Sequence, residues 1–178
     1  GKIDYLVPLG TTGESVTLSK DERVAVLDFV LETVGKRVPV VVGIGGNNTR
    51  EVVNTLQDYD YSGVEAILSV TPYYNKPSQR GLVQHYKAIA NEAPVPVILY
   101  NVPGRTGLNM TAETTLTLAN DVGNIIGIKE ASGNFEQIMA IIKNKPEDFL
   151  VISGDDMITL PLIACGADGV ISVVANAF

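Results

Sequence analysis

The sequence predicts an α/β protein, and within that class a (β/α)8 barrel, the TIM barrel. Three observations support this prediction. Seven short apolar runs recur about 20 to 33 residues apart, stretches with helical periodicity lie between them, and the glycine fingerprints of other α/β folds are missing. The 178 residues are enough for one sizeable core, so we expect a single domain over residues 1–178.

The predicted strands are rich in valine and isoleucine and are apolar on both faces. That pattern is typical of a parallel sheet buried on both sides. The seven runs are Asp4–Leu9, Val38–Val42, Val64–Val70, Val95–Tyr100, Ile125–Lys129, Phe149–Ser153 and Gly169–Val174. Because parallel strands need crossover connections, the six intervening stretches are predicted to be helices.

The first predicted helix carries the clearest local signals. Ser19 and Glu22 form the S-x-x-E pattern of a capping box, and Gly35 stands where a helix often ends. Apolar residues follow the box at steps of three and four, which places them on one helix face: Val24, Leu27, Leu31 and Val34. Ser78 and Thr111 are expected to cap two later helices.

The other fold that alternating strands and helices commonly form is an open, doubly wound sheet. Its glycine fingerprint has no match, because the nearest candidate, residues 43–48, ends in Asn48 where the third glycine belongs. A complete barrel has about 250 residues and eight strands. We therefore expect an incomplete barrel that lacks its first strand and its C-terminal helices.

Composition excludes several classes of function. The formal net charge is −7 with scattered basic residues, which argues against a nucleic-acid partner. Cys165 is the only cysteine and His85 the only histidine, so neither a disulfide framework nor a multi-histidine metal site is expected. No apolar run has the length of a membrane span, and no signal peptide is apparent. We expect a cytoplasmic protein.

In a β/α barrel the active site forms at the carboxyl ends of the strands. Polar residues follow five of the predicted strands, in the segments Gly10–Ser15, Thr71–Pro77, Tyr100–Gly107, Lys129–Gly133 and Ser153–Asp156. These segments are therefore the candidate site.

Lys129 is the unusual residue among them, because it ends an otherwise apolar strand. Burial lowers the pKa of a lysine, and a neutral amine attacks carbonyl groups to form a Schiff base. The alternative is a lysine that reaches from the strand end to solvent. Tyr100 also ends a strand, where its phenol is able to exchange a proton. Its position alone favours a buried structural tyrosine with a satisfied hydroxyl.

Other polar residues give weaker signals. Thr11 and Thr12 lie in a glycine-flanked turn that is able to hold a carboxylate, and Arg105 is able to bind a second one. Four further residues are expected to be structural. His85 is placed on a helix surface and Cys165 in the core, while Asp155 and Asp156 are expected to favour the start of the next helix.

Taken together and in this order, the five segments resemble those of the dihydrodipicolinate synthase branch of the N-acetylneuraminate lyase family of Schiff-base aldolases. The resemblance covers essentially the whole chain. It implies a homotetrameric lyase that condenses pyruvate with L-aspartate 4-semialdehyde in diaminopimelate and lysine biosynthesis. It also implies that no metal and no organic cofactor is used.

The resemblance further implies residue roles. Lys129 forms the imine with pyruvate, and the proton relay consists of Tyr100, Thr11 and Tyr74, the last from a neighbouring subunit. The substrates are bound by Thr12, Ile171, Gly154 and Arg105, with Arg105 receiving the carboxylate of the aldehyde substrate.

A lysine feedback site is implied at Ser15, Lys20, Asn47, Glu51 and Tyr73. Lys20 and Arg23 replace histidines of lysine-sensitive members, and two cations repel an incoming ammonium group, so weak inhibition by lysine is expected.

Two alternative functions stay open. An aldolase or lyase of the same family would act on a 2-keto-3-deoxy sugar acid or on N-acetylneuraminate. A barrel that binds pyruvate without catalysis is the other.

Overall fold

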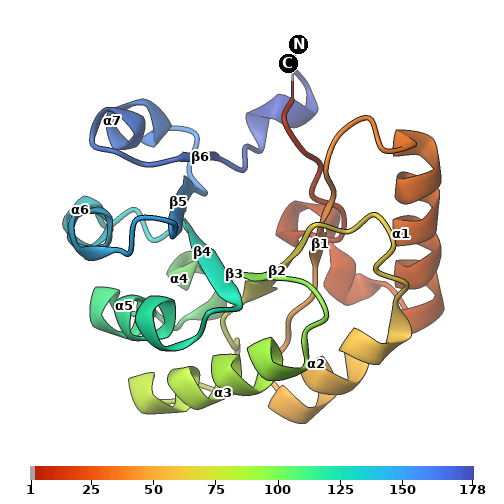
Figure 1. The fold of residues 1–178 in the computed structure, drawn as a ribbon, viewed down its shortest axis with the longest axis horizontal. Helices are drawn as coiled ribbons and strands as arrows, with labels where there is room; N and C mark the ends of the chain where they lie inside the picture. Colours follow the sequence, from red (N-terminus) through yellow and green to blue (C-terminus); the bar gives the residue numbers. More distant parts are fainter. Residues whose placement is uncertain (1–2) are drawn as a thin grey trace.

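The alternation of apolar runs and amphipathic stretches folds into six parallel strands with helices outside them (Figure 1). The computed structural model describes residues 3–178. The strands lie in the sheet in their order along the chain. They are β1 (Val41–Gly43), β2 (Ala66–Val70), β3 (Val97–Asn101), β4 (Ile125–Glu130), β5 (Leu150–Ser153) and β6 (Gly169–Val170).

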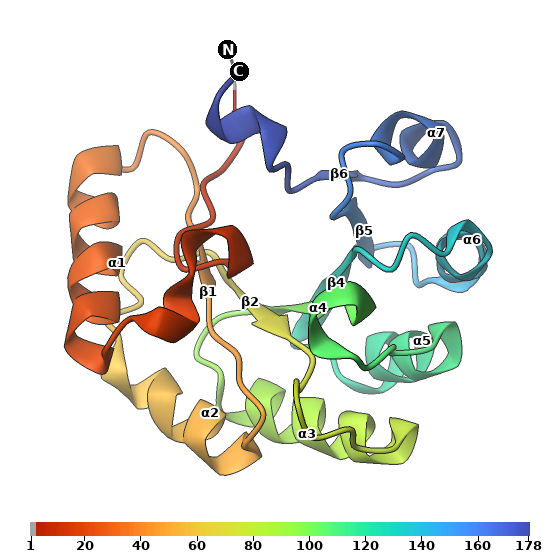
Figure 2. The same cartoon turned by 180° about the vertical axis from the view of Figure 1, so that it is seen from behind.

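The sheet curls, and a partial ring of helices surrounds it (Figures 1 and 2). The helices are α1 (Lys20–Val34), α2 (Thr49–Thr55), α3 (Gln79–Glu92), α4 (Pro103–Thr106), α5 (Ala112–Asp121), α6 (Phe135–Asn144) and α7 (Thr159–Ala164). Four single-turn 3-10 helices complete the secondary structure of the described residues: Thr11–Gly13, Ser15–Thr17, Leu56–Asp58 and Val174–Asn176. The short helix α4 lies apart from the outer ring, after the carboxyl end of β3 (Figure 2).

The first predicted strand, Asp4–Leu9, does not form as a strand and is reduced to one bridge between Leu6 and Val40. The Leu6 amide donates to the carbonyl of Pro39 at 3.0 Å, and the Val41 amide donates to that of Leu6 at 2.9 Å. Two features limit the pairing. Pro8 has no N–H to donate, and Leu9 turns the chain with a φ of 58°.

Two apolar clusters lie on opposite faces of the sheet. The larger one joins strand residues such as Ile67, Leu99 and Ile128 to helix residues such as Leu27 and Leu118. The smaller one contains alternate residues of the same strands and no helix residue: Val41, Ala66, Leu68, Ile98, Tyr100, Val102 and Ile152. Both faces are thus covered along most of the sheet, which explains why the strands read as continuous apolar runs.

The helix ends follow the predicted capping signals. Ser19 and Glu22 form a reciprocal capping box, with the Ser19 amide donating to the Glu22 carboxylate at 2.8 Å. Gly35 closes α1 with a φ of 54°. Ser78 and Thr111 accept hydrogen bonds from backbone amides at the starts of α3 and α5. These three helices therefore begin where local sequence directs them to begin.

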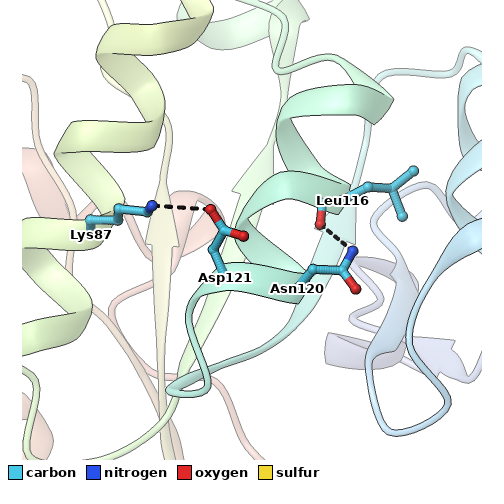
Figure 3. Close-up of polar contacts among 4 residues, drawn as sticks. All are labelled: Lys87, Leu116, Asn120 and Asp121. Carbon is cyan, nitrogen blue, oxygen red and sulfur yellow. Dashed lines mark hydrogen bonds and ion pairs between the residues drawn. The ribbon is translucent and has the colours of Figure 1, made fainter.

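The neighbouring helices α3 and α5 are joined at their surface by Lys87 and Asp121 (Figure 3). The Lys87 ammonium lies 3.1 Å from the Asp121 carboxylate. Beside this pair, the Asn120 amide donates within α5 to the Leu116 carbonyl at 2.7 Å. Because Lys87 and Asp121 are exposed, their pair contributes at most about 1 kcal/mol, so buried apolar packing holds these helices.

The expected surface position of His85 is wrong. Its side chain is 5% exposed, and Nδ1 lies 2.8 Å from the Thr49 hydroxyl, which joins α3 to α2. The ring packs edge to face against Tyr86. Burial lowers the pKa of His85 to about 4. Helical periodicity alone did not reveal this burial, because a polar residue was assigned to the outer face by its type.

We expect His85 to make the protein less stable in mild acid. As the pH falls from about 6.5 to about 4, the unfolded chain takes up a proton that the folded protein excludes, so stability falls. The difference between the pKa of about 6.5 in the unfolded chain and about 4 in the folded protein corresponds to about 3 kcal/mol in the free energy of unfolding. Urea unfolding at several pH values checks this, with His85→Asn as the comparison. If the free energy of unfolding fell equally with pH in both proteins, the prediction would be wrong.

Cys165 also departs from its expected place. It is only half-buried and stands at the end of α7 rather than in the core. Separately, none of the helices in residues 3–178 has the length and apolar character to cross a membrane.

Candidate active site

The inner face of the sheet brings Tyr100 and Lys129 together. They are register partners at the ends of β3 and β4, and the Lys129 nitrogen lies 4.3 Å from the centre of the Tyr100 ring. Their exposed fractions are 5% and 8%. The aromatic face stabilises the ammonium form, while exclusion of water disfavours it.

Burial has the larger effect on Lys129 and lowers its pKa to about 8. The negative charge of Asp156 acts in the opposite direction, and the positive charge of Arg105 adds to the lowering. At pH 7 roughly a tenth of the amine is therefore neutral, far more than for an ordinary lysine with a pKa of about 10.4, and a nucleophilic amine must be neutral. The interpretation of Lys129 as an ordinary solvent-reaching lysine does not fit its burial.

Gly154 lies against the Lys129 side chain. An added Cβ at this position would stand 2.9 Å from Cε of Lys129 and 2.7 Å from Cβ of Ala131. Contacts that short do not occur without displacement of a neighbour. Glycine is thus required here for a close approach of β5 to the lysine.

Two cavities open at this end of the sheet, and Thr11 borders both. The first, of about 450 Å³, is bordered by Tyr100, Arg105 and Tyr73. The second, of about 570 Å³, is bordered by Lys129, Thr12, Ile171 and Tyr5. Thr11 is therefore shared by the cavity that Lys129 borders and the cavity that Arg105 borders.

Local sequence explains the position of Arg105. Pro103 begins α4 at a position where a missing N–H costs nothing, and Gly107 ends that single turn with a φ of 69°. The buried Thr106 hydroxyl donates to the Leu108 carbonyl at 3.0 Å and so fixes the turn. Arg105 itself is exposed at the border of the first cavity.

Tyr74 is the one predicted relay residue that this chain does not bring to the cavities. It is 93% exposed and has a left-handed backbone with a φ of 70°. A positive φ is strained for a tyrosine.

The five residues predicted for lysine binding fall into two groups. Ser15 and Tyr73 border the first cavity, as does Arg23, and Asn47 donates to the Tyr73 carbonyl at 3.0 Å. Asn47, Glu51 and Lys20 do not border the first cavity themselves. Glu51 is exposed on α2, and Lys20 pairs with Asp58 at 2.7 Å.

The expected role of Asp155 and Asp156 at a helix start is wrong, because α7 begins only at Thr159. The Asp155 carboxylate accepts from the Met157 amide at 2.9 Å in a local turn. Asp156 accepts from the amide of Val173 at 3.0 Å and so holds the segment after Ile171. The prediction rested on the closeness of both aspartates to the next helix in the sequence. The contact between Asp156 and Val173, 17 residues away, exists only in the folded chain.

Sequence reasoning also missed the residue after the lysine. Glu130 is fully buried on the outer face of β4 and accepts four hydrogen bonds. A glutamate at the end of an apolar strand indicates a buried polar group, but the chemistry was assigned to the neighbouring Lys129 alone. Within residues 3–178, no cluster of three or more metal-ligating side chains is present.

The comparisons agree with this geometry. The model of the dihydrodipicolinate synthetase family matches residues 1–178. A 4-hydroxy-tetrahydrodipicolinate synthase of Parabacteroides distasonis is 59% identical over 175 residues, which are 98% of this chain and 59% of the relative. The chain thus spans about three fifths of the length of this curated relative.

Solved structures give the same likeness. The 4-hydroxy-tetrahydrodipicolinate synthase of Methylacidiphilum fumariolicum SolV is 42% identical with a TM-score of 0.96, over 99% of this chain and 59% of that one. The chloride-inhibited dihydrodipicolinate synthase of Acinetobacter baumannii, solved with pyruvate, is 46% identical with a TM-score of 0.93. That match covers 97% of this chain and 59% of the other.

Proposed function

The chain belongs to the dihydrodipicolinate synthetase family, and from that premise we propose that the protein condenses pyruvate with L-aspartate 4-semialdehyde through an imine on Lys129. The product would be 4-hydroxy-tetrahydrodipicolinate, an intermediate of diaminopimelate and lysine biosynthesis. The observation that carries the proposal is the buried Lys129 amine beside Tyr100, with a pKa lowered to about 8.

The chemistry begins at the neutral Lys129 amine. It attacks C2 of pyruvate, and loss of water from the carbinolamine gives the imine. Loss of a proton from C3 gives the enamine, whose C3 forms a bond to the aldehyde carbon. The amino group of the second substrate then attacks C2, closes the ring and releases Lys129. No step of this scheme calls for a metal or an organic cofactor.

The proton transfers need a donor beside the amine. We propose Tyr100 for this role, because its ring lies against the Lys129 amine, and Thr11, which borders both cavities, as the residue that passes protons between them. We propose Tyr74 of a neighbouring subunit as the third relay member, which fits its exposure in this chain. The assembly that places it there would be a homotetramer.

Substrate binding is divided between the two cavities in this proposal. Thr12 and Ile171 border the second cavity and would hold the pyruvate carboxylate, while Gly154 leaves the space beside the imine free. Arg105 borders the first cavity and would bind the carboxylate of the aldehyde substrate.

Removing the Arg105 guanidinium is expected to weaken binding of the second substrate. A lost hydrogen bond to a charged group corresponds to a roughly 10- to 100-fold rise in KM for L-aspartate 4-semialdehyde. Steady-state kinetics of Arg105→Ala checks this, and Arg80→Ala, an exposed arginine on α3, is the control. Trapping of pyruvate by borohydride should stay near the wild-type rate. A rise in KM for pyruvate alone would contradict the assignment.

The sugar-acid alternative is separated by substrate. Consumption of aspartate semialdehyde supports the proposal, whereas release of pyruvate from a 2-keto-3-deoxy acid or from N-acetylneuraminate supports the aldolase. A non-catalytic pyruvate-binding barrel would give neither reaction.

We propose that the whole protein closes the curled sheet into an eight-stranded barrel of one domain. Two features support this closure. The strands follow one another in chain order with parallel pairing throughout. The Tyr5 hydroxyl also lies 3.4 Å from the Val170 carbonyl, so the segment before β1 approaches β6 from the other end of the sheet.

Lysine is expected to inhibit the whole enzyme only weakly. Arg23 borders the first cavity, and an incoming ammonium group meets repulsion from its guanidinium there. Lys20 lies outside that cavity, and its pairing with Asp58 raises its pKa, so it adds a second positive charge nearby in sequence. Turnover at millimolar lysine checks this, and the double substitution Lys20→His with Arg23→His should make inhibition stronger. Strong suppression of the wild-type enzyme would overturn it.

A further inference from the structure

The residues next to Lys129 and Tyr100 form a second pair on the opposite face of the sheet. Asn101 and Glu130 are register partners, one position beyond Tyr100 and Lys129. The exposed fraction of both side chains is 0%. Because side chains alternate along a strand, these two face the helices while the amine and phenol face the cavities.

The Glu130 carboxyl is held entirely by N–H donors. The Asn101 side-chain amide lies 3.2 and 3.1 Å from the two oxygens, and the Gln137 amide lies 2.9 Å from one of them. The Ser132 backbone amide donates to the other at 2.8 Å. Among residues 3–178, no lysine or arginine forms an ion pair with it. Because these hydrogen bonds satisfy a buried carboxyl group, they hold Asn101, Ser132 and Gln137 in place around it.

The network also reaches the loop that follows Arg105. The Met110 amide donates to the Asn101 side chain at 3.0 Å, and Asn101 donates to the Asn109 side chain at 2.9 Å. Gln137 donates to the Met110 carbonyl at 3.1 Å. Strands β3 and β4, the loop from α4 to α5, and helix α6 are thus joined by one hydrogen-bond network around the Glu130 carboxyl.

We propose that Glu130 is a positioning residue that, through Asn101, holds the ends of β3 and β4 so that the Lys129 amine stays against the Tyr100 ring. The inference rests on the proposed function for the imine at Lys129. A backbone shift at residue 130 moves residue 129 with it, because the two share a peptide unit. Misplacement of a reacting group by about 1 Å is enough to slow a reaction by roughly 100-fold.

Glu130→Gln is the sharpest test, since it keeps the shape and replaces one acceptor oxygen by an NH2 group that meets N–H donors. In the full-length protein we expect borohydride trapping of pyruvate to slow by about tenfold or more. Its pH midpoint should also move to a more alkaline value, because an amine released toward water loses the burial that lowers its pKa.

Leu118→Ala is the control for stability alone. Leu118 is a fully buried residue of α5 that belongs to the apolar core, so its truncation weakens the fold without touching the network. We expect the control to keep the wild-type pH midpoint. An unmoved midpoint in Glu130→Gln, or a rate equal to that of Leu118→Ala, overturns the proposal.

A swapped pair keeps the test decisive if Glu130→Gln does not fold. Asn101→Asp combined with Glu130→Gln restores one donor facing one acceptor, and it should trap pyruvate faster than Asn101→Asp alone. A swapped pair that is no faster overturns the proposal. Failure of the wild-type protein itself to trap pyruvate would instead reject the proposed function, and the inference with it.

Discussion

Replacing Lys129 by alanine is expected to abolish the condensation and the covalent capture of pyruvate. Without the amine no imine forms, and loss of a covalent nucleophile lowers turnover by at least roughly 1000-fold. Mass spectrometry after pyruvate and borohydride should find the reduced adduct on Lys129 in the wild-type protein and none in Lys129→Ala. The matched control is Lys143→Ala, which removes an exposed lysine on α6.

The same experiment gives a pH dependence. The pKa of Lys129 is lowered to about 8, so the neutral fraction of the amine rises as the pH rises through that value. The rate of adduct formation should increase toward pH 8 and level off above it. A rate that keeps rising up to about pH 10, the range of an ordinary lysine, would show that the amine is not buried in the working enzyme.

An adduct on any other lysine would contradict the Schiff-base assignment. A wild-type protein that binds pyruvate but gives no adduct would favour the non-catalytic barrel. These two outcomes are distinct, because peptide mapping locates the adduct while binding is measured without borohydride.

Gly154→Ala is expected to have the second largest effect. The new methyl group has no room, since it would stand 2.7 Å from Cβ of Ala131 and 2.9 Å from Cε of Lys129. Either the lysine rotates away from Tyr100 or β5 moves away from β4. Overpacking of this kind costs about 1–3 kcal/mol of stability, and displacement of the amine should lower kcat/KM by roughly 100-fold.

Gly123→Ala is the matched control for this substitution. A Cβ at Gly123 meets nothing within 4 Å, so the same chemical change should leave stability and turnover near the wild-type values. Thermal unfolding and steady-state kinetics of both variants give the comparison. Wild-type kcat/KM in Gly154→Ala would mean that the close approach to Lys129 has no part in catalysis.

Much of the fold was predictable from local sequence. The capping box of Ser19 and Glu22 defined the start of α1, and apolar runs located six of the seven expected strands, because a parallel sheet buried on both faces needs them. The run Asp4–Leu9 was overestimated. Its apolar composition suits a strand, but Pro8 and the left-handed Leu9 restrict it to one bridge.

The candidate site was predictable in part for a similar reason. Lys129 and Tyr100 stand at strand ends, and the topology of a β/α barrel places strand ends at one edge. Their pairing at 4.3 Å follows from the register of β3 with β4, which chain order alone does not give.

The sequence by itself determined the type of most elements, the caps of α1, α3 and α5 and the residues at the strand ends. Only the tertiary structure decided which polar groups are buried. His85 and Glu130 carry polar side chains that a sequence reading assigns to water or overlooks, yet the fold encloses both and supplies hydrogen-bond partners from distant segments. Burial depends on what packs against a residue from elsewhere in the chain, and local sequence contains no record of that.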